Sequence, residues 1–474
     1  MPNRLDLSKP KHIHFIGIGG ISMSALAMIL LGRGWQVSGS DLRQSPLTDR
    51  LVQNGATVYL GHHAESVNGA QAVVYTSAIP PDNVELEAAR AHGIPIFSRA
   101  ELLGDLMAEA RCSIAVAGSH GKTTTTAMIG VMLDHAGLKP TVLVGGDLEA
   151  IQGNVKVGNG GYLVAEACEY YDSFLALRPR IGVITNIDAD HLDYFRNIEN
   201  IKRAFRRFAE LLPPEGYLVA LNDDPNVHDI LPGLNCHVVT FGLEAGADWQ
   251  ATNIKLPAGG SSFDLLHQGK AVGRVKLKVP GLHNVQNALA AIAVGHIVGL
   301  DINTIARGFS IYNGTQRRFQ LQGSYRGALI FDDYAHHPRE IKATLAAART
   351  FKPQRIISVF QPHTYTRTKA LMQDFSTAFD DSDLVLLTDI FAAREENVHN
   401  VSSMQLAAQM HNTHPAACYI GGIYDAAEYL RHELRPGDLL LTLGAGDVHR
   451  VADVLLGKEP GHKPGGHSTL LALD

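Results

Sequence analysis

The chain has 474 residues, a formal net charge of −6 and a hydrophobic content of 45%. That length exceeds what one hydrophobic core supports and predicts two to four domains. The composition is typical of a soluble α/β protein and excludes a disordered chain. Because no basic patch offsets the acidic balance, we expect no nucleic-acid partner.

The four cysteines are scattered, without a Cys-x-x-Cys pair. This spacing argues against a disulfide framework or a zinc site and fits a reducing, cytoplasmic location. The apolar run 25–31 is far too short to span a bilayer. It also follows a strand and a glycine turn, which argues against a signal peptide. We therefore expect no membrane partner.

The first motif, in residues 12–41, reads as a strand, a glycine turn, a helix from Ser24 and a second strand. It resembles a Rossmann fingerprint in which a serine replaces the third glycine. The motif predicts a nucleotide or nucleotide-like diphosphate at the helix N-terminus, although an α/β unit that binds nothing has the same pattern. The candidate contacts are Gly17, Gly19, Gly20, Ile21, Ser22 and Asp41.

A buried strand that starts at Ala72 leads to two further candidates, Thr76 and Ser77. Loops after strand C-termini are where α/β sheets bind ligands. Ser98 then predicts the N-cap of a helix. We expect the first domain to cover residues 1–104.

The second domain opens with the strand 112–117, a glycine loop and a helix, and it carries Gly-Ser-His-Gly-Lys-Thr. This is a compact variant of the phosphate-binding P-loop. Lys122 is suited to contact the outer phosphates of ATP and Thr123 to ligate Mg²⁺; an ordinary strand–turn–helix corner is the plain alternative. The predicted ATP contacts in this loop are Gly118, Ser119, His120, Gly121, Lys122, Thr123 and Thr124.

Acidic and imidazole side chains directly follow two more predicted strands. The strand 162–165 is followed by Glu166, and the strand 181–185 leads into Asn186–Asp193. A carboxylate at a strand end beside a P-loop suits Mg²⁺, so Glu166 is a candidate ligand. His191 belongs to a cluster of Asp, His and Asn residues just past a strand, which indicates a functional site. For Asp188 and Asp193, capping or turn formation explains the sequence equally well.

Polar side chains recur later in the chain. Asn284 and Asn287 are three apart at a helix start, so they share a face that either holds a nucleotide or caps the helix. A third α/β rhythm has predicted strands at 328–331, 355–360, 384–387, 417–420 and 438–443. We expect domains at 105–313 and 314–457, short antiparallel strands at 236–280, and a disordered tail at 458–474.

Together these motifs resemble the Mur ligase family of peptidoglycan synthesis. The matching stretches span essentially the whole chain: HFIGIGG with SMSALA, GSHGKTTT, EACEYYDSF, TNIDADHLD, PGLHNVQN, GTQRRF, DDYAHHP and QPHTYTRT. The resemblance implies a Rossmann-like N-terminal domain for a UDP-sugar, a central P-loop ATPase-like domain for ATP and Mg²⁺, and a Rossmann-like C-terminal domain that closes on the amino acid.

The activity implied is ATP-dependent ligation of L-alanine to the carboxylate of UDP-N-acetylmuramate through an acyl phosphate, by a monomer or homodimer. In that resemblance Lys122, Glu166 and His191 are catalytic, and Thr123, Glu166 and His191 hold metal. The remaining family positions are Asn284, Asn287, Arg318 and Asp333 for ATP, and Tyr334, His336 and Arg367 for the amino acid.

Three alternatives stay open. A ligase of the same family that recycles a murein tripeptide onto UDP-N-acetylmuramate shares the motifs. An NAD(P)-dependent oxidoreductase would explain Gly17, Gly19 and Asp41. It leaves Lys122, Glu166 and His191 without a role. A nucleotide-regulated binding protein would not need the set of lysine, glutamate and histidine.

Overall fold

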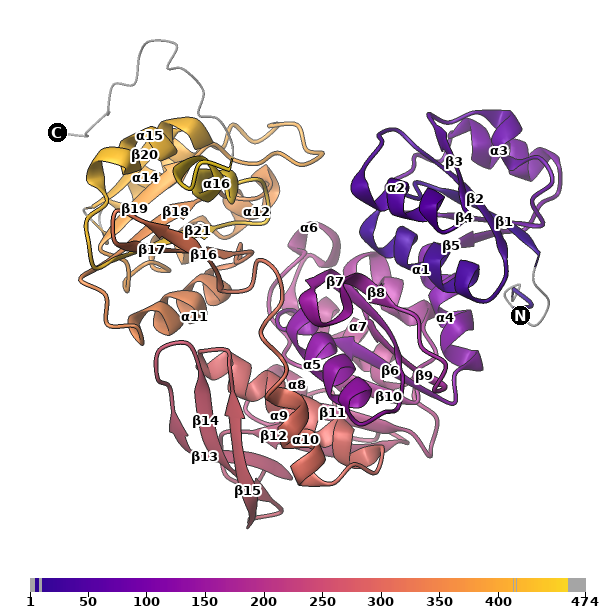
Figure 1. The fold of residues 1–474 in the computed structure, drawn as a ribbon, viewed down its shortest axis with the longest axis horizontal. Coiled ribbons are helices and arrows are strands. Elements are labelled where there is room, and N and C mark those ends of the chain that lie inside the picture. The colour runs from indigo at the N-terminus through magenta and orange to yellow at the C-terminus, as the bar shows by residue number, and fades with distance from the viewer. Residues whose placement is uncertain (1–4, 8–10, 412, 415, 459–474) are drawn as a thin grey trace.

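The computed structural model describes residues 5–7, 11–411, 413–414 and 416–458. Three α/β bodies follow one another along the chain, each with its own sheet (Figure 1). The first and third bodies lie on either side of the top of the middle one (Figure 1). The three-part α/β fold class predicted from the sequence is confirmed. Apart from Lys458, the tail expected to be disordered lies outside the described residues.

The first sheet has five parallel strands in the order β3-β2-β1-β4-β5. Helix α1 begins at Ile21, three residues before the predicted start, because Gly20 already has the extended backbone of an N-cap. The elements are β1 (His12–Ile16), α1 (Ile21–Gly32), β2 (Gln36–Asp41), α2 (Pro46–Gln53), β3 (Thr57–Leu60), β4 (Ala72–Tyr75), α3 (Val84–Ala91) and β5 (Ile96–Ser98).

Helix α4 (Arg99–Glu109) starts at the predicted cap, since the Ser98 hydroxyl accepts from the Glu101 amide. The predicted boundary at Gly104 falls inside this helix. Gly104 packs so closely against the carbonyl of Ala176 that a Cβ would overlap it. Because α4 is continuous through Gly104 and packs there against the middle body, we propose that the domain boundary lies at an end of α4 and not at Gly104.

The middle sheet has ten strands in the order β15-β14-β13-β12-β11-β10-β6-β9-β7-β8. The prediction of antiparallel strands at 236–280 is correct for β13 to β15 and wrong for β12, which runs parallel to β11. The strands are β6 (Cys112–Ala117), β7 (Thr141–Leu148), β8 (Gly153–Lys156), β9 (Tyr162–Glu166), β10 (Ile181–Ile184), β11 (Tyr217–Leu221), β12 (His237–Gly242), β13 (Trp249–Lys255), β14 (Ser261–His267) and β15 (Lys270–Leu277).

Helix α5 is buried along residues 123–133 and packs against α9 on one face of this sheet. Burial on every side anchors the loop that precedes it. The other elements of this body are η2 (Glu149–Ile151), η3 (Tyr170–Ala176), α6 (Leu192–Phe195), α7 (Ile198–Ala209), α8 (Pro225–His228) and α10 (Ile302–Phe309); α5 spans Lys122–His135 and α9 Leu282–Ile297.

The third sheet has the order β16-β17-β21-β18-β19-β20. All five predicted strands are present, and an unpredicted antiparallel strand, β16, adds an edge. The elements are β16 (Gln320–Tyr325), β17 (Ala328–Asp333), α11 (Pro338–Arg349), β18 (Arg355–Phe360), α12 (Tyr365–Ala370), α13 (Met372–Ser376), β19 (Leu384–Thr388), α14 (Ser403–Met410), β20 (Ala417–Gly421), α15 (Ile423–Glu433), β21 (Asp438–Leu443) and α16 (Arg450–Leu455).

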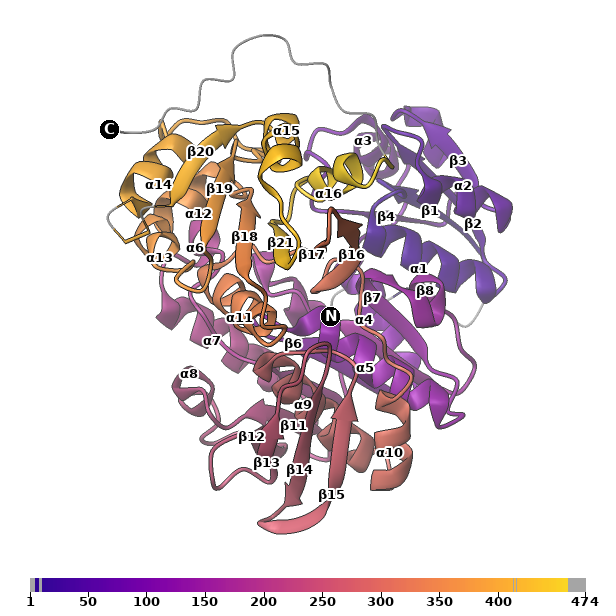
Figure 2. The same ribbon diagram turned by 60° about the vertical axis from the view of Figure 1, so that its left-hand side comes forward.

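A second view, turned by 60°, shows α11 facing the middle body and the P-loop helix α5 below it (Figure 2). Within the described part of the chain, no helix combines the length and apolar character that crossing a bilayer requires.

Candidate active site

The P-loop between β6 and α5 depends on two glycines. Gly118 and Gly121 have φ angles of 140° and 83°, which L-residues rarely adopt. A Cβ on Gly118 would overlap the Thr185 hydroxyl, and one on Gly121 would lie 2.5 Å from Asn287 Oδ1. The loop is therefore held against the residue that follows β10 on one side and against α9 on the other.

Lys122 is paired with a residue that the sequence did not single out. Its Nζ lies 2.9 Å from Glu169 Oε1 and donates to the carbonyls of Gly118 and Ser119 at 2.5 and 3.1 Å. Burial opposes its charge, but the Glu169 carboxylate raises the pKa of Lys122 above its usual value. Lys122 therefore stays cationic at the mouth of the loop.

The predicted metal ligands fall into two groups. The Thr123 hydroxyl donates to Glu166 Oε2 at 3.1 Å, and the Gly145 amide donates to the other carboxylate oxygen. Burial raises the pKa of Glu166. His191 instead has its Nε2 3.9 Å from Glu169 Oε1, and its φ of 51° marks a strained backbone. The structure thus joins Thr123 to Glu166 and His191 to Glu169.

A cavity of about 390 Å³ lies between the middle and C-terminal bodies. Burial raises the pKa of Asp333 to about 6, against the opposing charge of Arg318. The Asn287 amide donates to Asn284 Oδ1 at 3.3 Å, so the two asparagines form one polar wall. The predicted ATP contacts that line this cavity are His120, Gly121, Thr124, Asn284, Asn287, Arg318 and Asp333.

A second cavity, of about 170 Å³, contains Arg367, His191 and Asp190. The Nη2 and Nε of Arg367 donate to Asp190 Oδ1 at 3.0 and 3.3 Å, across the two bodies. Both side chains are nearly buried. Despite that burial, Arg367 holds the pKa of Asp190 well below its usual range.

The other two predicted amino-acid contacts adjoin this cavity through His363. The Nη1 of Arg367 lies 3.3 Å from His363 Nδ1, and the rings of His363 and His336 are 5.9 Å apart. The Tyr334 ring is 5.4 Å from the His336 ring. Burial lowers the pKa of His336 to about 3 and that of His363 to about 4, so both imidazoles are neutral.

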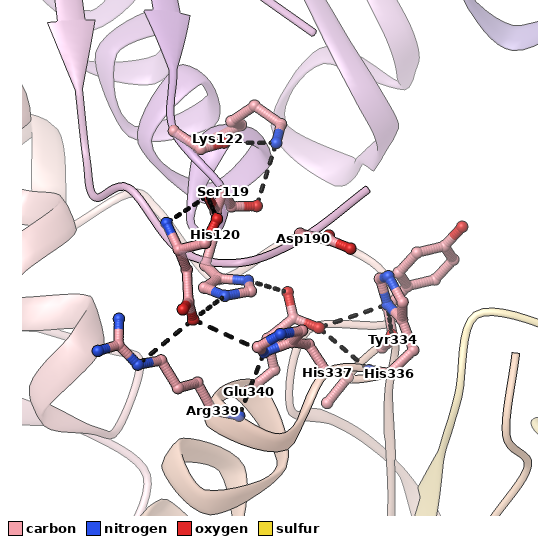
Figure 3. A network of polar contacts seen from close by, with 12 residues as sticks. Ser119, His120, Lys122, Asp190, Tyr334, His336, His337, Arg339 and Glu340 are labelled. Carbon is pink, nitrogen blue, oxygen red and sulfur yellow. Dashed lines mark hydrogen bonds and ion pairs between the residues drawn. The ribbon is translucent and has the colours of Figure 1, made fainter. Parts of the chain in front are cut away.

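His120 is bound on both of its ring nitrogens (Figure 3). Its Nε2 is 3.2 Å from Asp188 Oδ2 and its Nδ1 is 3.1 Å from Glu340 Oε1. Burial opposes the charge, yet these carboxylates raise the pKa of His120 to about 9. His120, Asp188 and His337 place ligand atoms within 4.8 Å of one another, but an imidazolium that donates twice leaves no lone pair for a metal.

The predicted UDP-sugar contacts surround the first glycine turn. The Gly19 amide donates to Asp41 Oδ2 at 2.9 Å, and the Thr76 methyl group lies next to Gly17. Ile21 and Ser22 belong to the first turn of α1. Asp41 also lines a cavity of about 230 Å³. The exposed Ser77 follows β4.

Comparison with known families accounts for all three bodies. Residues 12–111 match the family model described as "Mur ligase family, catalytic domain", residues 116–295 match "Mur ligase middle domain", and residues 317–446 match "Mur ligase, glutamate ligase domain". The chain belongs to the Mur ligase family.

The similar proteins are Mur ligases, and the similarity covers nearly their whole length. The UDP-N-acetylmuramate–L-alanine ligase of Caldanaerobacter subterraneus subsp. tengcongensis is 50% identical over 453 residues, which cover 95% of this chain and 98% of that protein. Crystal structures of MurC from Thermotoga maritima (28% identity, TM-score 0.79) and of a murein peptide ligase from Psychrobacter arcticus (25%, 0.69) each cover 94% of this chain and are themselves 98% covered.

In this Mur ligase, three carboxylates that contact predicted site residues were not themselves predicted from the sequence. Glu169 and Asp190 stood within quoted motifs, three residues after Glu166 and one before His191. Glu340 stands three residues after the second histidine of DDYAHHP. Each contacts a predicted residue that lies far away along the chain, 47 residues for Glu169 and Lys122 and 220 for Glu340 and His120, so no local sequence signal links the partners.

Proposed function

We propose that this Mur ligase joins L-alanine to the carboxylate of UDP-N-acetylmuramate at the expense of ATP. The observation that carries the proposal is the juxtaposition of two cavities at one domain junction. A cavity beside the P-loop accommodates a nucleotide, and a cavity at Arg367 accommodates a small amino acid. The identity of 50% to a ligase of this activity supports the same assignment.

In the proposed assignment, the triphosphate lies on the P-loop and Lys122 leaves Glu169 to contact its outer phosphates. The amides of Asn284 and Asn287 and the Arg318 guanidinium face the remaining nucleotide from the larger cavity. The Asp333 carboxylate, which accepts from the Phe319 and Ala335 amides at 2.7 Å, is rigid enough to select hydroxyl groups.

The residues at the P-loop fit Mg²⁺. Thr123 Oγ1 and the Glu166 carboxylate are adjacent oxygen donors, which Mg²⁺ prefers. His191 and Glu169 offer a second pair beside Lys122. When bound, Mg²⁺ would offset the repulsion between the phosphate and the substrate carboxylate.

The amino acid binds, in this proposal, with its carboxylate on Arg367. Asp190 accepts from Nε and Nη2 of Arg367 and so keeps the guanidinium in place. The carboxylate of the amino acid would bind the part of the guanidinium that Asp190 does not occupy. His336 and His363, with pKa values of about 3 and 4, are too weakly basic to remove a proton from an ammonium group near neutrality. We therefore assign them to positioning by hydrogen bonds.

The chemistry follows in two balanced steps. A carboxylate oxygen of UDP-N-acetylmuramate attacks the γ-phosphorus, and ADP leaves. The L-alanine amine then attacks the acyl carbon, and phosphate leaves with that oxygen as the amine gives up a proton. The first domain would hold the UDP-sugar at its glycine turn, with Asp41, Thr76 and Ser77 nearby. Closure of the three bodies would exclude water from the acyl phosphate.

The test is phosphate release from ATP in the presence of UDP-N-acetylmuramate, with L-alanine, with the L-Ala-γ-D-Glu-diaminopimelate tripeptide, or with neither. Release that depends on L-alanine supports the proposal. Release with the tripeptide alone would assign the recycling reaction. If neither L-alanine nor the tripeptide stimulates phosphate release, both reactions are excluded. Mass measurement in solution decides between monomer and homodimer, which the sequence left open.

A further inference from the structure

Glu340 touches both proposed ligand sites, yet the proposed reaction assigns it no role. It stands in the first turn of α11, and its side chain is only 13% exposed. One carboxylate oxygen, Oε1, lies 3.1 Å from Nδ1 of His120 in the P-loop. The other, Oε2, accepts from the His336 amide at 3.0 Å and lies 3.4 Å from His336 Nδ1. Figure 3 shows Glu340 between these two histidines.

A glutamate at this helical position usually satisfies the start of its own helix. Glu101 of α4 does so: it is exposed, and its carboxylate accepts from the amide of the helix cap, Ser98, at 2.6 Å. Glu340 differs because its Oε1 contacts His120, a residue of another domain, and not the start of its own helix. The N-cap of α11 is provided by His337.

The two contacts of Glu340 lie on opposite sides of the domain junction. His120 and Glu340 both line the nucleotide cavity, so a bound nucleotide would adjoin their contact. His336 faces His363, which contacts Arg367 in the smaller cavity. One carboxylate therefore connects the P-loop of the middle body with the amino-acid side of the C-terminal body.

We propose that Glu340 is a positioning residue that couples occupancy of the nucleotide cavity to binding of the amino acid. This inference rests on the proposed function, because it takes His336 and Arg367 as the amino-acid site. Nucleotide binding stabilises the closed junction, and Glu340 then holds His336 in place before L-alanine arrives. By reciprocity, L-alanine tightens nucleotide binding by the same factor.

The experiment measures the dissociation constant of L-alanine by calorimetry, without nucleotide and with a saturating non-hydrolysable ATP analogue, at saturating UDP-N-acetylmuramate. In the wild-type enzyme we expect the saturating analogue to lower this dissociation constant by about 5- to 150-fold, the usual span of coupling between sites. Glu340→Gln keeps the size but not the charge, and we expect it to reduce the factor to near one with a smaller change in kcat. Glu340→Asp keeps the charge and should retain part of the coupling.

Glu101→Gln is the matched control, since it alters the same helical position away from the site; its coupling factor should equal that of the wild type. A factor of one in the wild type, or an unchanged factor in Glu340→Gln, would overturn the proposal. Equal rises in the dissociation constant of L-alanine with and without the analogue, which leave the factor unchanged, would do the same. If Glu340→Gln does not fold, the Glu340→Asp factor decides, and a wild-type value overturns the proposal. Absence of phosphate release dependent on L-alanine in the wild type would instead overturn the proposed function.

Discussion

The ion pair between Arg367 and Asp190 joins two domains, and its removal should affect the amino acid more than the nucleotide. At 3.0 Å, with an effective dielectric constant of about 20, the attraction is roughly 5–6 kcal/mol before desolvation is subtracted. Side-chain exposures of 13% and 9% make that desolvation large. We expect a net coupling of about 2 kcal/mol, within the range measured for contacting residues.

The perturbation is a double-mutant cycle of Arg367→Ala, Asp190→Ala and the double variant, assayed by phosphate release against L-alanine concentration. Each single change leaves one charge nearly buried without its partner. The double variant should therefore retain a kcat/KM about 30-fold higher than the product of the single effects. Arg367→Ala alone should raise the KM for L-alanine more than that for ATP.

The control cycle uses Arg33 and Glu109, an exposed pair at 2.8 Å. Its coupling should stay below about 1 kcal/mol in stability, and neither change should alter kcat/KM. Effects of Arg367→Ala and Asp190→Ala that add within about 0.5 kcal/mol would refute the reasoning. An effect of Arg367→Ala confined to ATP would overturn the placement of the amino acid.

Three further predictions concern the P-loop. Lys122→Ala should lower ATP turnover at least about 100-fold while calorimetry still detects UDP-sugar binding; normal turnover would remove the P-loop argument. Gly118→Ala should cost about 1–3 kcal/mol in urea unfolding because its Cβ would overlap Thr185, whereas Gly137→Ala, whose Cβ meets nothing within 4 Å, should cost less. His120, with its pKa raised from 6.5 to about 9, contributes stability that is fully present below pH 6.5 and lost as the pH rises through 9. His120→Gln should therefore flatten the fall in melting temperature over that window, and an unchanged fall would contradict the assignment.

The sequence predicted the central strands well, for a physical reason. Parallel strands buried on both faces are continuous apolar runs, as in Ile181–Ile184 and Asp438–Leu443. The hairpin β7–β8 escaped because Gly145 and Gly146 interrupt its pattern, and β16 escaped because an edge strand carries polar residues. The glycine loops, in contrast, were predictable from residue type alone, because glycine favours the positive φ angles that such turns require.

The site was predictable residue by residue but not contact by contact. Motif chemistry led to Lys122 and Arg367, whereas their carboxylate partners depend on how distant segments meet. Glu169 reaches Lys122 just before η3, where Tyr171 and Asp172 adopt left-handed backbone angles. Asp190 lies 177 residues from Arg367 in another domain. Such pairings follow from domain packing, which no local pattern records.

The measurement that tests the central claim most directly follows an oxygen atom. UDP-N-acetylmuramate labelled with ¹⁸O in its carboxylate is incubated with ATP and L-alanine, and the released phosphate is analysed by mass spectrometry. The proposed reaction predicts one labelled oxygen in each phosphate, released only when L-alanine is present. Unlabelled phosphate would contradict an acyl-phosphate path, because the oxygen would then come from water.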